Sequence, residues 1–198
     1  MLRGDRPQIV LQRVELLRLQ RKDAVALQLL APISEEAVFN TDAMPKVLLA
    51  AILHLAAGES AQVEPLLRQA RVELQARLGS LPDNYSNGQS ERVALADTEA
   101  LLGDEAAALA TTQQALTQLP VEKDAFAGAE TLAQAAKVYA RLGRTDLILP
   151  ILERLRLLPG ADYSISASTL TLDPVWDKVR ADPRFQAEIK RFAEFDQP

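Results

Sequence analysis

The chain has 198 residues, 48% of them hydrophobic but only 5% aromatic, and it contains no cysteine, which excludes disulfides, thiolate zinc sites and thiol catalysis. Its 27 acidic and 22 basic residues sum to a net charge of −5, and the basic residues are dispersed, so nucleic acid is not expected as a direct partner. No apolar run approaches the roughly 20 residues that a membrane-spanning helix needs, so we expect no membrane insertion by this segment.

A 3.6-residue hydrophobic period predicts nine helices, and most of these fall into pairs. The links within three of the pairs are short and contain Gly58, Gly103 or Gly143. The links between pairs are longer and are predicted as connectors at 32–42, 79–89, 120–124 and 159–168. This alternation is typical of stacked antiparallel helical hairpins. The predicted helices are 8–19, 22–31, 43–57, 61–78, 90–102, 105–118, 127–142, 145–157 and 184–195.

The three glycines occur in the same local pattern. Seven positions before them stand Ala51, Ala96 and Ala136, small residues that allow two helices to pack closely. Each glycine also tolerates the left-handed conformation that ends a helix, and the polar residue after it can cap the next helix. The glycines therefore predict tight turns between paired helices.

This pattern resembles the tetratricopeptide repeat family. The match is best where Ala96, Gly103, Ala108, Ala115 and Pro120 all fall in phase with the family pattern. The copies around Gly58 and Gly143 are less complete, and the first hairpin lacks the glycine. The resemblance implies an all-α, right-handed superhelix of three to four antiparallel hairpins within residues 1–160, at about 7–32, 43–78, 89–120 and 126–158.

The last part of the chain, 161–198, is predicted to be a C-terminal cap with a capping helix. Asp173-Pro174 and Asp182-Pro183 are each predicted to be an N-cap followed by a first-turn proline, so two helices should begin there. Residues 172–185 also look like the closing segment of bacterial signalling proteins in which such repeats follow a kinase, cyclase or winged-helix module. That resemblance implies a cytoplasmic location, or a periplasmic one if the chain belongs to a membrane-anchored protein.

No catalytic constellation is recognisable. The single histidine, His54, lies four residues before Gly58, and Ala57 and Gly58 occupy the places where a helical metal site needs a second ligand. The acidic residues fall at predicted helix starts and on polar faces, where the helix dipole explains them. We therefore expect no enzyme activity, no cofactor and no metal.

The resemblance implies that the first helix of each hairpin lines a concave face that binds a peptide or protein. We expect the chain to be a non-catalytic interaction scaffold of a bacterial signalling or regulatory system; the alternative is a self-associating oligomerisation domain, and a homodimer stays open. For the apolar positions on the first of these helices, burial between neighbouring helices is an equally good interpretation. The positions that the resemblance assigns to partner contact are Leu48, Leu49, Ile52, Val93, Asp97, Glu130, Gln134 and Lys137.

Overall fold

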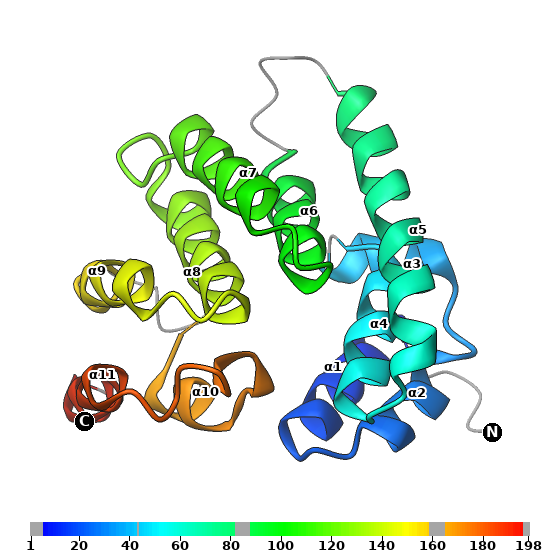
Figure 1. The fold of residues 1–198 in the computed structure, drawn as a ribbon, viewed down its shortest axis with the longest axis horizontal. Coiled ribbons are helices and arrows are strands. Elements are labelled where there is room, and N and C mark those ends of the chain that lie inside the picture. Colours follow the sequence, from blue (N-terminus) through cyan, green and yellow to red (C-terminus); the bar gives the residue numbers. More distant parts are fainter. Residues whose placement is uncertain (1–5, 43, 82–87, 159–164, 196–198) are drawn as a thin grey trace. The chain divides into compact units, whose positions relative to one another are not determined.

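The computed structural model describes residues 6–42, 44–81, 88–158 and 165–195, and every regular element in these ranges is helical (Figure 1). The all-α prediction is thereby confirmed for this part of the chain. The elements are α1 Pro7–Leu19, α2 Asp23–Leu30, α3 Glu35–Asp42, α4 Lys46–Ala56, α5 Ser60–Gly79, α6 Gln89–Leu101, α7 Glu105–Gln118, α8 Ala125–Arg141, α9 Thr145–Arg156, α10 Ala167–Leu172, the 3₁₀-helix η3 Pro174–Trp176 and α11 Pro183–Phe195.

The chain divides into two compact units, 1–81 and 82–198. The first contains α1 to α5 and the second α6 to α11. The predicted cap, 161–198, belongs to the second unit together with two of the predicted hairpins. Each unit is described by itself below.

Three hairpin turns share one hydrogen-bonding pattern. Gly58, Gly103 and Gly143 have φ values of 78°, 80° and 73°, in the left-handed region that glycine adopts without strain. The amide after each glycine donates to the carbonyl five residues earlier, and the glycine amide donates to the carbonyl three residues earlier. This is the Schellman motif, which satisfies the last carbonyls of a helix. The predicted glycine turns are confirmed.

The turn between α1 and α2 has the same motif without the glycine. Arg21 has a φ of 58°, and the Lys22 amide donates to the Leu17 carbonyl at 2.8 Å. Seven positions before Arg21 lies the buried Val14, and five positions after it lies the buried Ala26, which matches the phase of the other turns. The left-handed conformation costs a non-glycine residue about 1–2 kcal/mol, so tertiary packing has to hold this turn in place.

The first unit is built from two hairpins with a short helix between them. α1 packs on α2, α2 on α4, and α4 on α5. The inserted α3 contacts α1 and α4, and the Arg77 guanidinium of α5 lies 3.7 Å from the centre of the Phe39 ring of α3. The shared core of these helices includes Leu11, Val14, Ala26, Leu30, Val38, Leu49 and Leu53.

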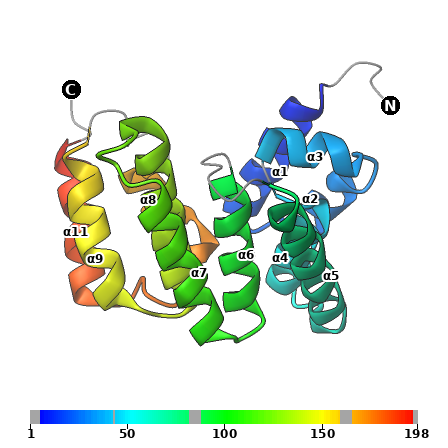
Figure 2. The ribbon, with the colours of Figure 1, turned by 90° about the horizontal axis from the view of Figure 1, so that it is seen from above.

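The second unit stacks its two hairpins directly on one another. α8 contacts its own partner α9 and also both α6 and α7 of the preceding hairpin (Figure 2). Gly128 allows this close stacking, because a Cβ atom there would lie 2.7 Å from the backbone N and Cα of Val121. The connection between α7 and α8 therefore lies directly against the first turn of α8.

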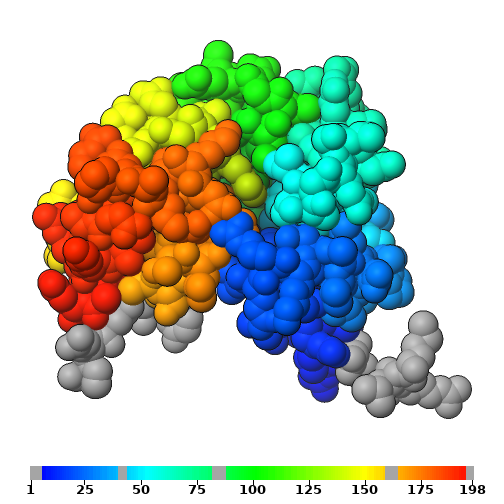
Figure 3. Space-filling view, turned by 60° about the horizontal axis from the view of Figure 1, so that its bottom comes forward, coloured from blue at the N-terminus to red at the C-terminus, as the bar shows by residue number. Residues whose placement is uncertain are grey.

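The C-terminal segment of the second unit covers both helices of the last hairpin. η3 contacts α8, and α11 packs along α9, as the orange and red atoms beside the yellow ones in Figure 3 show. The fully buried rings of Trp176 and Phe185 lie 5.5 Å apart between their centres. Asp173 and Asp182 accept hydrogen bonds from the amides of Val175 and Arg184, both at 2.9 Å, as N-caps should. Pro174 nevertheless begins a single 3₁₀ turn, where the sequence predicted a longer helix.

Two of the predicted connectors contain helices. α3 occupies most of the 32–42 connector, and α10 begins inside the 159–168 connector. Both helices are short, with Val38 fully buried in α3 and Leu170 fully buried in α10. A helix of one or two turns with so little buried apolar surface produces no detectable hydrophobic period.

The second helices of two hairpins, α5 and α9, contain a proline at the same position. Pro65 in α5 and Pro150 in α9 each lie seven residues after the turn glycine, and both are exposed. In α7 the equivalent residue is Ala110. A proline inside a helix removes one amide donor, so the carbonyls of Ala61 and Asp146 lose their helical partners.

Candidate partner-binding face

The predicted contact residues on α4 belong largely to the interior of the first unit. Leu48 and Leu49 are buried, and Leu49 packs in the core cluster with Leu53. Ile52 is half-buried. The assignment of Leu48 and Leu49 to a partner surface is therefore corrected, because the phase that faces a partner in the resembling family coincides here with the phase that packs against neighbouring helices.

On α6 the two predicted residues differ in their surroundings. Val93 is buried in a cluster with Ala96 and Ala108 and is likewise a core residue. Asp97 accepts a hydrogen bond from Arg141 Nε of α8 at 3.1 Å, and the two side chains are 18% and 15% exposed. The charge of Asp97 thus has a structural partner 44 positions along the chain.

The predicted residues on α8 form one stripe along the helix. Glu130, Gln134 and Lys137 follow at intervals of four and three residues, which places them on the same side of an α-helix. Glu130 is exposed, and Gln134 and Lys137 are half-buried. Gln134 Nε2 donates to Glu130 Oε1 at 2.7 Å. The structure therefore brings these three predicted residues together.

Two further residues extend this stripe, one at each end of α8. Phe126 lies four residues before Glu130 and is 75% exposed, and Arg141 lies four residues after Lys137. Asp124 fixes the start of the helix by accepting hydrogen bonds from the amides of Phe126 and Ala127. We call the set Phe126, Glu130, Gln134, Lys137 and Arg141 the α8 face. The sequence analysis missed Phe126 because it placed the helix start at 127, although Asp124 is a strong N-cap signal.

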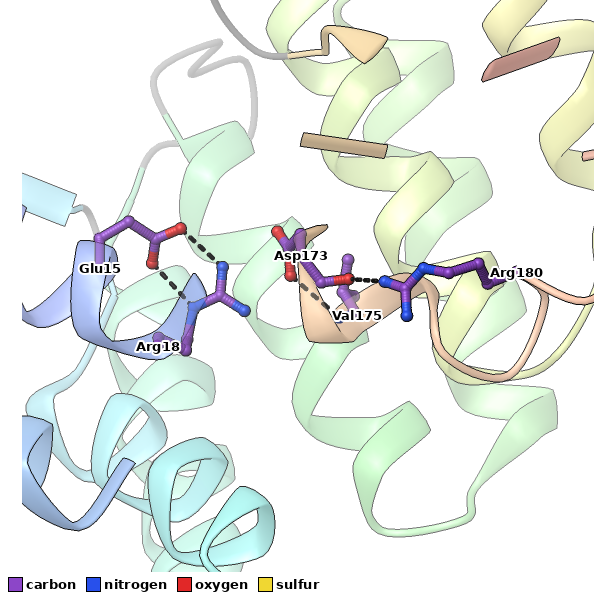
Figure 4. Close-up of polar contacts among 5 residues, drawn as sticks. All are labelled: Glu15, Arg18, Asp173, Val175 and Arg180. Atoms are coloured by element: carbon purple, nitrogen blue, oxygen red, sulfur yellow. Dashed lines mark hydrogen bonds and ion pairs between the residues drawn. The ribbon is translucent and has the colours of Figure 1, made fainter. Parts of the chain in front are cut away.

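The C-terminal segment borders the basic end of the α8 face. Lys178 Nζ donates to the Arg141 carbonyl at 2.7 Å, where a cation also complements the negative end of the helix dipole. Two residues after Lys178, an Arg180 Nη atom donates to the Asp173 carbonyl at 2.6 Å, and the Asp173 carboxylate caps η3 (Figure 4). These bonds hold the segment beside α8.

A second polar network follows the hairpin turns of the second unit. Arg144 donates to Asp146 and to Glu105, which links the starts of α9 and α7. The hydrogen bond from Arg144 lowers the pKa of Asp146. The Asp182 pKa falls to about 2, mainly because the Arg184 side chain and amide donate to the carboxylate. The three acidic side chains lie at helix starts, where the dipole favours negative charge, and the two arginines bond to them, which accounts for all five without a ligand.

The first unit has its own polar cluster at the Arg21 turn. Arg18 donates to both carboxylate oxygens of Glu15 (Figure 4). Burial raises the pKa of Asp23 against the opposing effect of Arg18 and Arg21. The cluster contains no residue of the predicted partner face.

Among the residues that the structure describes, no group of three or more His, Asp and Glu side chains could hold a metal ion. His54 Nδ1 lies 2.6 Å from Glu59 Oε2 across the Gly58 turn. Burial raises the pKa of the Tyr139 hydroxyl, which sits in the core cluster of the second unit. Buried Tyr139 therefore stays protonated at neutral pH.

Comparison of the chain with protein-family models, with curated proteins and with solved structures finds no match. Within the described ranges, no helix combines the length and the apolar character that crossing a membrane requires.

Proposed function

We propose that the protein is a non-catalytic scaffold that binds another protein through the α8 face. The single observation that carries this proposal is the α8 face itself. It joins a 75% exposed phenylalanine to an ordered row of polar side chains on a helix whose other sides are buried. Phe126 is the most exposed large hydrophobic side chain among the described residues, and aromatic residues are enriched where proteins bind each other.

The repeat architecture is part of the same proposal. In a right-handed superhelix of tetratricopeptide type, α6 and α8 would be the first helices of successive hairpins, and their shared side would be concave. The Schellman turns, the small residues Ala96 and Ala136 and the contacts of α8 with α6 support this arrangement within the second unit. A place in a bacterial signalling or regulatory system rests on the sequence resemblance of the C-terminal segment.

Site-specific photocrosslinking tests the proposed function. A benzophenone amino acid at position 134 should form a covalent adduct with a protein partner in cells that produce the chain natively. Lys137→Glu, one turn away, should abolish that adduct by reversing the charge beside it. The matched control places the crosslinker at Gln186, an exposed residue of α11. Identical adducts from both positions, or adducts insensitive to Lys137→Glu, would contradict the proposal.

A further inference from the structure

The charges along the α8 face are ordered from acidic to basic. Its first half carries Glu130, and the N-cap Asp124 precedes the helix. Its second half carries Lys137 and Arg141, with Lys178 bonded at the helix end. The unit as a whole is acidic, with 12 basic and 18 acidic residues in 82–198, and Asp97 pairs with Arg141 at the basic end. A surface with opposite charges at its two ends is electrostatically complementary to a second copy of itself rotated by 180°, because the acidic end of each copy then faces the basic end of the other.

The spacing of the residues makes this complementarity specific. Glu130 and Lys137 are equally far from the point between Ala133 and Gln134, and so are Phe126 and Arg141. If two α8 helices lay antiparallel across a twofold axis at that point, Glu130 of each copy would face Lys137 of the other. Phe126 of each copy would lie at the level of Arg141, and an aromatic ring attracts a guanidinium. Such a twofold arrangement makes every favourable pair occur twice.

We propose that the partner of the α8 face is a second copy of this chain, paired antiparallel through α8. This inference rests on the proposed function, because it names the partner of the same face. Near the axis, the half-buried Gln134 can bond to its counterpart as donor and acceptor. Asp97 holds Arg141 by Nε alone, which fixes the guanidinium at the end of the face.

Such an interface is polar, so it forms a weak dimer that salt weakens further. The two ion pairs between Glu130 and Lys137 of opposite copies contribute to this dimer, and exposed ion pairs are screened at high ionic strength. Raising the salt concentration should therefore raise the dimer dissociation constant. The direction of this effect separates the proposed pairing from an apolar seam, which salt does not weaken.

Charge-reversal variants on each side of the axis test the pairing. Sedimentation velocity of the whole chain across a dilution series measures the dimer dissociation constant of each variant. In a dimer of the Glu130→Lys variant, a lysine faces a lysine at both pairing positions. In a dimer of the Lys137→Glu variant, a glutamate faces a glutamate at both. Each variant alone should raise the dimer dissociation constant at least about tenfold, because like charges face each other. An equimolar mixture of the two variants should recover association, and so should the double variant Glu130→Lys/Lys137→Glu.

Lys190→Glu, on the exposed side of α11, is the matched control, because it changes the net charge as Lys137→Glu does without touching the α8 face. It should leave the dissociation constant unchanged. A wild-type chain that stays monomeric, or a dimer indifferent to both reversals, would overturn the pairing. In that case an adduct from position 134 to a different protein, lost on Lys137→Glu, would still support the proposed function. Failure of both experiments would reject the face altogether.

Discussion

The two compact units use the same hairpin turn but join their hairpins differently. In the first unit the eight-residue helix α3 separates the two hairpins, and Arg21 occupies the left-handed position of the first turn. In the second unit α8 packs directly on the preceding hairpin, and glycine occupies both left-handed positions. The comparison shows that the turn tolerates a change of residue, whereas the connection between the stacked hairpins lies so close to α8 that a Cβ at Gly128 has no room.

Substitution of Gly128 is the change expected to have the largest effect. In Gly128→Ala the new methyl group would lie 2.7 Å from the Val121 backbone, which cannot move aside like a flexible side chain. We expect the free energy of unfolding to fall by about 2 kcal/mol or more. Chemical denaturation followed by circular dichroism measures this change.

Gly79→Ala provides the matched control for this prediction. Gly79 ends α5 in the first unit, and a Cβ atom there would meet nothing within 4 Å. The same substitution should therefore be neutral or stabilise by at most about 1 kcal/mol. Equal losses from both variants would contradict the assignment of the cost at Gly128 to the contact with the Val121 backbone.

Substitutions at the left-handed turn positions should change stability less than Gly128→Ala does, and by a similar amount in both units. The Arg21→Gly variant should be more stable than Arg21→Ala by about 1 kcal/mol. Both variants lack the arginine side chain, so only the cost of the left-handed backbone distinguishes them. Gly103→Ala should lose a similar amount. Thermal unfolding of Arg21→Gly, Arg21→Ala and Gly103→Ala measures both differences. If alanine equalled glycine at position 21 but not at position 103, the two turns would not be equivalent.

Acid should affect the turns of the two units in opposite directions, and this is the smallest effect. The pKa of Asp182 is lowered to about 2 and that of Asp146 is also lowered, so their contribution is complete above pH 4 and is lost as the pH falls towards 2. The pKa of Asp23 is raised, so folding disfavours its carboxylate and acidification adds stability there. Hydrogen exchange in α9 and α11 should therefore lose protection at pH 3, after correction for the intrinsic rate, while α2 should not.

Asp182→Asn is the control for the acid prediction. This variant should already show reduced protection in α11 at pH 5 and should change less on acidification. Loss of protection in α2 equal to that in α11 would contradict the assignment of the acid effect to these carboxylates.

Sequence reasoning located the long helices and the glycine turns because both depend on local signals. It placed the first turn between 19 and 22 but could not predict the left-handed conformation of Arg21, since an arginine carries no such signal and only tertiary packing holds it there. It also missed α3 and α10, whose buried surface is too small to produce a period.

For the candidate face, sequence reasoning grouped three residues on one side of α8 and misjudged burial on α4 and α6. Glu130, Gln134 and Lys137 share one side of α8, as predicted. Leu48 and Val93 are buried, because burial depends on which neighbouring helices pack over a position. The partner of Asp97 was equally invisible, since Arg141 reaches it from another hairpin. Helix periodicity thus predicts on which side of a helix a residue lies, whereas the packing of neighbouring helices determines whether that residue is exposed to solvent.

The two helix prolines have a mechanical consequence. At Pro65 and Pro150 the helix lacks a hydrogen bond on its solvent side, at the same height in α5 and α9. Each helix is therefore most compliant one turn and a half from its start, whereas α7, with Ala110 there, is stiffer. Under a bending load α5 and α9 would each yield first at its own proline.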